Sequence, residues 1–278
     1  MNTTQITNTT KQRRPSRAMW PQAALVSLLL TACQSVPPEG LTRDPEQAAR
    51  TRTAIAAQYI QSGELDAAQR HLQQALEANP RSAAAHNMMG VLLQTEGSAV
   101  NLRRAEESYK RAIELEPSFA QAHNNYGVFL SKQQRYTEAL QRFEVAGATL
   151  GYEGRASALE NLGRTALLIG NTERAKKAFE QAIHADRGAI EARHELAQLL
   201  LDQGKLTEAS RWFTEYRQLL GRSPLDAGSL WLGMRISRLQ QDQTRLQEYA
   251  LQLQQRYPNS EQYQRYLRIL QTPGTPWK

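Results

Sequence analysis

The chain has 278 residues, of which 40% are hydrophobic and 7% aromatic, and it carries a formal net charge of +7. The surplus is concentrated at the amino terminus, because residues 1–32 contain four basic residues and no acidic one. Without that segment 30 basic residues face 27 acidic ones, a net charge of +3. This balance argues against a nucleic-acid-binding protein, whose phosphate contacts need a concentrated basic surface.

The first 32 residues have the order of a secretory signal. A polar segment that ends in basic residues precedes the apolar run AALVSLLLTA at positions 23–32. A run of this length is typical of a signal peptide and is too short to cross a bilayer as a helix. We therefore predict a signal peptide over residues 1–32.

Leu30-Thr31-Ala32-Cys33 resembles a bacterial lipobox. In lipoproteins of this kind the cysteine carries a diacylglycerol, the preceding peptide is removed, and the new amino terminus receives a further acyl chain such as palmitate. Cys33 is the only cysteine, so it has no disulfide partner within the chain. The resemblance implies lipidation at Cys33, and the glutamine at position 34, in place of aspartate, implies the outer membrane. The alternative is an inert, buried thiol in an uncleaved leader.

A short tether is expected over residues 33–44, because Pro37, Pro38 and Gly40 occur there without helical periodicity. Asp44 followed by Pro45 suits a helix start, with the aspartate as N-cap and the proline in the first helical position. We predict a first helix over Pro45–Ser62, ended by Gly63.

From residue 45 to 258 a pair of helical periods recurs every 34 to 37 residues. The first helix of each pair holds a small residue: Ala56, Gly90, Gly127, Gly163, Ala197 and Gly233. The second helix of the first five pairs holds an alanine: Ala68, Ala105, Ala139, Ala175 and Ala209. A large residue follows each alanine by four positions: Leu72, Tyr109, Phe143, Phe179 and Phe213. Small residues let two helices approach closely, and the large residue fills the groove beside them.

This pattern resembles the tetratricopeptide repeat, a helix–turn–helix of about 34 residues. It predicts an all-α solenoid of six units: 49–82, 83–119, 120–155, 156–189, 190–225 and 226–258. Extra residues near Gly97–Asn101 predict a longer turn inside the second unit. The sixth unit is the weakest match, because Arg245 occupies its alanine position. Residues 259–278 are expected to form a capping helix to about Gln271 and a frayed tail, where Trp277 either docks back or stays loose; we predict the second.

No catalytic constellation is found in the sequence. His194-Glu195 begins like a zinc-protease motif, but Gln198 stands where the second histidine is required. His86 and His123 occupy the position of a packing aromatic in the repeat. A phosphate-binding glycine loop and a nucleophile elbow are both absent from the sequence. We therefore expect no enzymatic activity, no metal and no cofactor.

The resemblance implies that the first helices line a concave side and bind a partner there. The register places nine residues on that lining: Thr53, Ala54, Ala57, Ile60, Asn87, Val91, Gln94, Asn124 and Val128. The first unit is notably apolar there, and exposed apolar surface often marks a partner site. The alternative is that the tether folds over this surface.

A lipobox followed by six such units is similar to the pilotin family, lipoproteins of type IV pilus biogenesis and stability. The resemblance implies anchoring at the periplasmic face of the outer membrane and a monomer apart from its partner. It implies secretin subunits as partners, whose localisation and multimerisation support pilus biogenesis and twitching motility. The alternative function is an envelope adaptor of the same architecture that recruits cell-wall enzymes or outer-membrane assembly factors.

Overall fold

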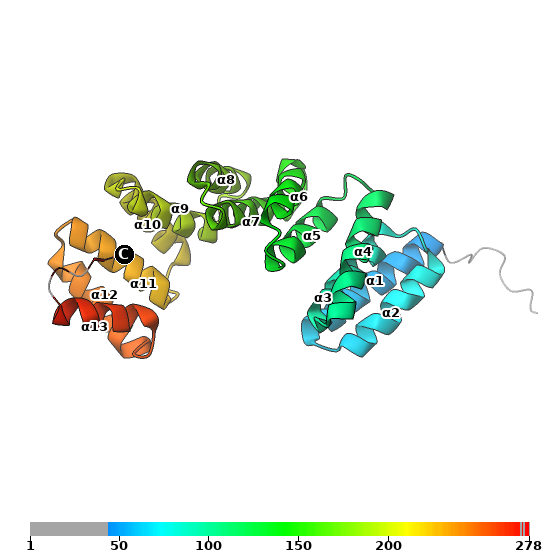
Figure 1. Ribbon diagram of the computed structural model, residues 1–278, viewed down its shortest axis with the longest axis horizontal. Coiled ribbons are helices and arrows are strands. Elements are labelled where there is room, and N and C mark those ends of the chain that lie inside the picture. The colour runs from blue at the N-terminus through cyan, green and yellow to red at the C-terminus, as the bar shows by residue number, and fades with distance from the viewer. Residues whose placement is uncertain (1–43, 273, 275, 278) are drawn as a thin grey trace, which may run out of the picture. The chain divides into compact units, whose positions relative to one another are not determined.

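The computed structural model describes residues 44–272, 274, 276 and 277, and every regular element in this part of the chain is an α-helix. The helices are α1 (Pro45–Ser62), α2 (Leu65–Ala78), α3 (Ala83–Glu96), α4 (Ala99–Leu115), α5 (Ala120–Lys132), α6 (Tyr136–Ala148), α7 (Arg155–Leu168), α8 (Thr172–Ala185), α9 (Ile190–Asp202), α10 (Leu206–Leu220), α11 (Ala227–Leu239), α12 (Gln243–Arg256) and α13 (Glu261–Gln271). Helices α1 to α12 form consecutive pairs, and α13 follows the last pair (Figure 1). The prediction of an all-α solenoid is confirmed, whereas the predicted signal peptide and Cys33 lie outside the described residues.

Short polar side chains start many of these helices, because a side-chain oxygen can accept a hydrogen bond from an otherwise unpaired amide of the first turn. The N-cap residues that do so are Asp44, Ser82, Ser98, Asn171, Asp226, Asp242 and Ser260. At α1 the amide of Glu46 donates to Asp44 at 3.0 Å, and Gly63 ends the helix with a φ of 80°. The predicted bounds of this first helix are confirmed.

The second unit differs from the sequence prediction in where its extra residues lie. We expected a longer turn, but Gly97 ends α3 and α4 already begins at Ala99. The Ser98 hydroxyl accepts a hydrogen bond from the amide of Asn101 at 3.1 Å, which starts the new helix at once. The insertion therefore lengthens α4, which has 17 residues, and leaves the turn short.

The crossing of the two helices in a unit depends on the small residue of the first helix. A Cβ atom added to Gly127 would lie 2.6 Å from the ring of Phe143, and one added to Gly163 would lie 2.4 Å from the ring of Phe179. Gly90 meets Tyr109 in the same way, at 2.7 Å. These distances are too short for a real contact, so the aromatic ring fills the space that a side chain would need. The predicted role of the small residues is confirmed.

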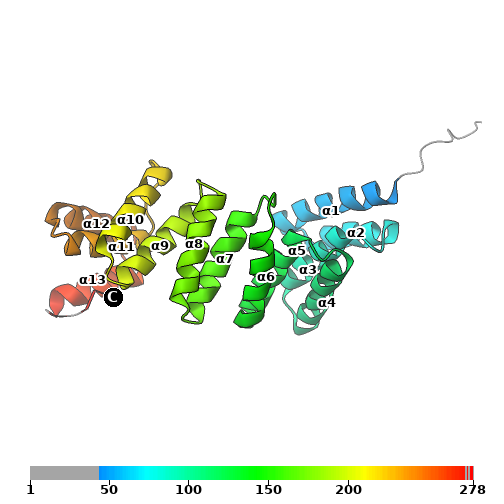
Figure 2. The same ribbon diagram turned by 90° about the horizontal axis from the view of Figure 1, so that it is seen from above.

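Neighbouring units pack through the first helix of the later unit, which contacts both helices of the earlier unit. Each odd-numbered helix from α1 to α11 contacts the next odd-numbered helix, whereas no two even-numbered helices contact each other in the described part of the chain. Figure 2 shows the pairs following one another in chain order. We call the surface formed by α1, α3, α5, α7, α9 and α11 the first-helix face. A continuous hydrophobic core runs from Leu93 to Leu253. A separate small cluster joins Ala56, Ala68 and Leu72 of the first unit to Leu92 of α3.

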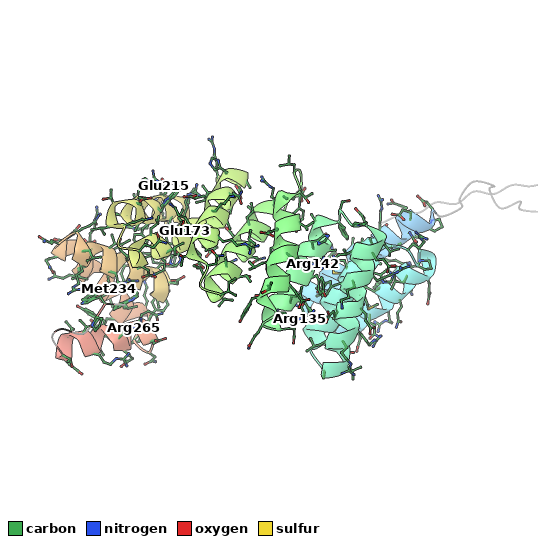
Figure 3. All side chains as sticks on the ribbon, turned by 45° about the horizontal axis from the view of Figure 1, so that its top comes forward. Arg135, Arg142, Glu173, Glu215, Met234 and Arg265 are labelled. Atoms are coloured by element: carbon green, nitrogen blue, oxygen red, sulfur yellow. The ribbon has the colours of Figure 1, made fainter. Side chains whose placement is uncertain are left out.

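Glu106 of α4 joins the second unit to the third. Its carboxylate accepts hydrogen bonds from the Tyr126 hydroxyl at 2.9 Å and from the Arg135 guanidinium at 2.8 Å, and it pairs with the Lys110 ammonium at 2.9 Å (Figure 3 labels Arg135). Burial alone would raise the pKa of Glu106, but the hydrogen bonds from these three donors outweigh burial and hold the pKa at about 2.

Replacing Glu106 with glutamine should therefore destabilise the chain at neutral pH and much less in acid. The pKa of Glu106 is lower in the folded than in the unfolded chain, so its stabilisation is present above about pH 4.5 and is lost as the pH falls towards 2. Because the three partners are partly solvated, we expect a loss of ~1–2 kcal/mol in the free energy of unfolding at pH 6, most of which disappears at pH 2.5.

Urea unfolding at the two pH values measures this difference. The matched control is Glu114→Gln, which removes the exposed ion pair with Arg111 and should change stability little at either pH. An equal loss for Glu106→Gln at pH 6 and pH 2.5 would contradict the assigned ionisation.

Candidate protein-binding surface

The apolar lining expected in the first unit is present on α1. Ala54 is exposed, and Ala57 and Ile60 are half-buried. They follow one another at intervals of three residues and so lie along one side of the helix. Ile60 also packs against the cluster of Ala56 and Leu72, so Ala54 and Ala57 are the two residues most available to a partner.

Two of the predicted lining residues lie in the interior. Thr53 is 7% exposed, and its hydroxyl donates to the carbonyl of Ala49 at 2.8 Å. Asn87 is 1% exposed, and its amide oxygen accepts a hydrogen bond from Asn125 at 3.1 Å. Close packing between the first helices of neighbouring units covers both side chains, and the predicted binding surface is corrected by removing them.

The asparagines of the first-helix face bind one another. Asn125 of α5 donates to Asn87 of α3, and Asn161 of α7 donates to the amide oxygen of Asn124 on α5 at 3.2 Å. Both bonds link the first helices of consecutive units, and Asn124 also contacts Tyr152. The amide oxygens of Asn87 and Asn124 are therefore used within the protein, which leaves less hydrogen-bonding capacity for a peptide.

The other predicted residues lie at the margin of the core. Val91 and Val128 are half-buried and pack against the continuous core. Gln94, also half-buried, accepts a hydrogen bond from the Tyr109 hydroxyl at 3.1 Å, which ties α3 to α4. Each of the three leaves part of its side chain at the surface, and Val91 and Val128 hold the position in their units that Ala57 holds in the first.

The histidines that replace the aromatic residue of the repeat have a structural role. The imidazole Nε2 of His86 donates to the carbonyl of Pro80 at 3.0 Å, and that of His123 donates to the carbonyl of Pro117 at 2.9 Å. Each histidine thus ties its helix to the preceding turn in the same way. Burial lowers the pKa of His123 and outweighs the hydrogen bond to the carbonyl of Pro117, which by itself favours the charged ring. In the described residues no group of three histidine, cysteine or carboxylate side chains could hold a metal ion.

A cavity of about 570 Å³ in the last units was not anticipated from the sequence. Its lining residues come from α9, the turn that follows it, α11 and α13: Gln198, Leu201, Asp202, Gly204, Trp231, Arg235 and Arg265. One residue in the sequence distinguishes this end of the protein. Trp231 lies two residues before the small residue of its unit, where the first unit has Ala54 and the third has Asn125. A tryptophan at a position that elsewhere reaches the surface marks this end of the first-helix face as different.

Trp277 packs beside this cavity and is not loose. Its ring stacks on Trp231 with ring centroids 5.4 Å apart and an angle of 6° between the planes. The prediction of a frayed Trp277 is thus corrected. The physical reason is that Trp231, Tyr266 and Arg238 offer the indole three favourable ring contacts, which sequence spacing cannot reveal.

Comparison with known proteins places these features in a family. Models of the tetratricopeptide repeat match residues 53–100, 118–188 and 166–221. The type IV pilus assembly protein PilF of Pseudomonas aeruginosa is 33% identical to the chain over 251 residues, which cover 88% of this chain and 97% of PilF. The chain belongs to the tetratricopeptide repeat family of PilF.

Solved structures agree with this assignment. A structure of P. aeruginosa PilF has a TM-score of 0.74 and 32% identity, and the match covers 81% of this chain and 98% of that one. PilW, described as a widely conserved type IV pilus biogenesis factor, has a TM-score of 0.67 and 26% identity over 80% of this chain and 99% of its own. MamA, at 22% identity and a TM-score of 0.51, shares the fold alone.

Membership of the PilF family fits the interactions seen in the repeats. Tetratricopeptide units stack through neighbours and present an extended surface to protein partners. The polar side chains of the first-helix face are held by structural hydrogen bonds between units, such as Asn161 to Asn124. None of the helices in the described ranges has the length and apolar character needed to cross a membrane.

Proposed function

We propose that the chain is a pilotin, an outer-membrane lipoprotein that binds secretin subunits of the type IV pilus and supports their localisation and multimerisation. The observation that carries this proposal is the match to PilF over 97% of that protein, with a lipobox ahead of the repeats. On this proposal the protein acts without covalent chemistry and contributes to pilus biogenesis and twitching motility.

The lipid would supply the membrane address. Acylation at Cys33 adds several chains, and each buried methylene contributes about 0.8 kcal/mol to membrane binding. The chain carries more than one such anchor on this proposal, which meets the requirement for stable attachment. The segment 34–43, with Pro37 and Pro38, then spaces the first helix from the bilayer at the periplasmic face of the outer membrane.

The first unit would supply the secretin-binding surface. Ala54 is exposed, and Ala57, Ile60 and, on α3, Val91 are apolar residues that are only partly buried. An apolar surface of this kind suits an apolar helix or extended segment of a secretin subunit. The small hydrophobic cluster of the first unit extends to Leu92 of α3, so a partner that covers this surface would also stabilise the contact between the first two units.

Replacing Ala57 with arginine should block this surface. The long charged side chain would stand where the partner's apolar surface has to approach, and we expect about tenfold weaker capture of purified secretin subunits. Arginine is a good helix former, so the helical circular dichroism should not change. Ala57 is preferred to Ile60 for this test because Ile60 packs against the first-unit cluster.

The matched control is Gln73→Arg, which places the same charge at an exposed residue of α2, outside the first-helix face. Capture should be unchanged in this variant. Equal capture by the Ala57 and Gln73 variants would show that secretin does not use this side of the first unit.

A further inference from the structure

Trp277 occupies a cage at the last unit. Besides the stack on Trp231, its ring meets Tyr266 of α13 edge-on, with centroids 6.0 Å apart, and the Arg238 guanidinium lies 4.9 Å from its centre. A second guanidinium, that of Arg265, lies 5.8 Å from the centre of the Trp231 ring. We call Trp231, Tyr266, Arg238 and Arg265 the indole cage.

The cage opens beside the cavity of about 570 Å³ described above, which Trp231 and Arg265 also line. Trp231 is 5% exposed, and its buried Nε1–H has no hydrogen-bond acceptor among the described residues. A buried donor without an acceptor is costly, typically by ~1–3 kcal/mol. An arriving chain that brings a carbonyl or carboxylate would satisfy this donor, which the chain's own tail does not.

The tail is not needed to close the solenoid. Helix α13 already contacts both α11 and α12 and covers the last unit with Tyr263, Tyr266 and Ile269. The segment after α13 has no regular structure at its described positions, so it can leave the cage without unfolding a helix. The segment after α13 therefore has the features of a ligand that can be displaced, and not those of an element of the hydrophobic core.

The charge of the cage indicates which ligand it prefers. Arg238 is exposed and makes no ion pair with any described residue, whereas Arg265 is paired with Glu261 at 2.7 Å. Arg238 therefore supplies the charge that a ligand can use. A tryptophan flanked by acidic residues would combine the same ring contacts with favourable charge.

We propose that the indole cage is a second protein-binding site, which takes an acidic partner segment carrying a tryptophan, and that Trp277 fills it until such a segment displaces it. The site is separate from the α1 surface, at the other end of the series of first helices. It therefore goes beyond the proposed secretin binding and gives the protein a second contact of different chemistry.

Fluorescence anisotropy with labelled peptides tests this proposal on the full chain. The probe is Asp-Pro-Gly-Asp-Pro-Trp-Glu, an acidic version of the chain's last seven residues, and the control probe has alanine for tryptophan. Trp277→Ala should bind the acidic probe at least about tenfold more tightly than the natural chain, because the cage is then empty. Binding should weaken as salt is added, and the alanine probe should not bind.

A second variant separates recognition from folding. Arg238→Glu, at an exposed position, in the Trp277→Ala background should remove most of the gained affinity while the helical circular dichroism stays unchanged. Equal affinity of the natural chain and Trp277→Ala, or no binding to either, would overturn the proposal and leave Trp277 as a structural contact of α13. Unchanged secretin capture in all these variants would show that the two sites are independent.

Discussion

Replacing Gly163 with alanine is expected to lower the free energy of unfolding by ~1–3 kcal/mol. Alanine is the better helix former by roughly 1 kcal/mol, so helix propensity alone predicts the opposite sign. The new Cβ atom would lie 2.4 Å from the Phe179 ring, which is fully buried and has no free space to move into. The cost of overpacking therefore exceeds the gain in helix propensity. Urea unfolding measures the resulting change in the free energy of unfolding.

A double-mutant cycle identifies the cause. Phe179→Leu should make room for the methyl group, because the first unit carries this combination naturally in Ala56 and Leu72. The loss caused by Gly163→Ala should shrink by at least ~1 kcal/mol in the Phe179→Leu background. Ser157→Ala, at an exposed position of the same helix, should stay within about 0.5 kcal/mol of the natural chain. A Gly163→Ala chain as stable as the natural one would contradict the close crossing.

Replacing Cys33 with serine is expected to abolish lipid attachment. Serine lacks the thiol that forms the thioether to diacylglycerol, so the precursor should stay unprocessed and should incorporate no radioactive palmitate. Labelling in growing cells followed by immunoprecipitation measures this, and membrane flotation measures the loss of anchoring. The control is Cys33→Ser with a signal peptide that needs no lipid, which should restore export of an unlabelled chain. Palmitate in the Cys33→Ser precursor would contradict lipidation at this residue.

The repeat architecture could be predicted from the sequence because its causes are local. Gly127 and Phe143 stand 16 positions apart within one helix pair, and the same spacing returns in the next unit with Gly163 and Phe179. A small residue and a ring at this spacing meet at one crossing, which the 2.6 Å and 2.4 Å distances confirm. The N-cap at Asp44 is equally local and gave the first helix its correct start.

Features that depend on contacts between units were harder to predict. Thr53 and Asn87 have the register of a surface lining, but both side chains are buried, and Asn87 is bonded to Asn125 of the next first helix. The extra residues of the second unit lengthen α4 because Ser98 is its N-cap, and a serine before a helical period is the local signal for this start. Trp277 required knowledge of Trp231 and Tyr266, which come together only in three dimensions.

Deletion of the gene tests most directly whether this member of the PilF family supports secretin assembly, as we propose. The gene is deleted, outer membranes are isolated, and heat-resistant secretin multimers are quantified by gel electrophoresis. We predict that multimers are lost or mislocalised and return with the natural gene but not with the Cys33→Ser gene. Normal multimers in the outer membrane of the deletion strain, above all together with altered cell-wall cross-linking, would contradict the pilotin function and favour an envelope adaptor.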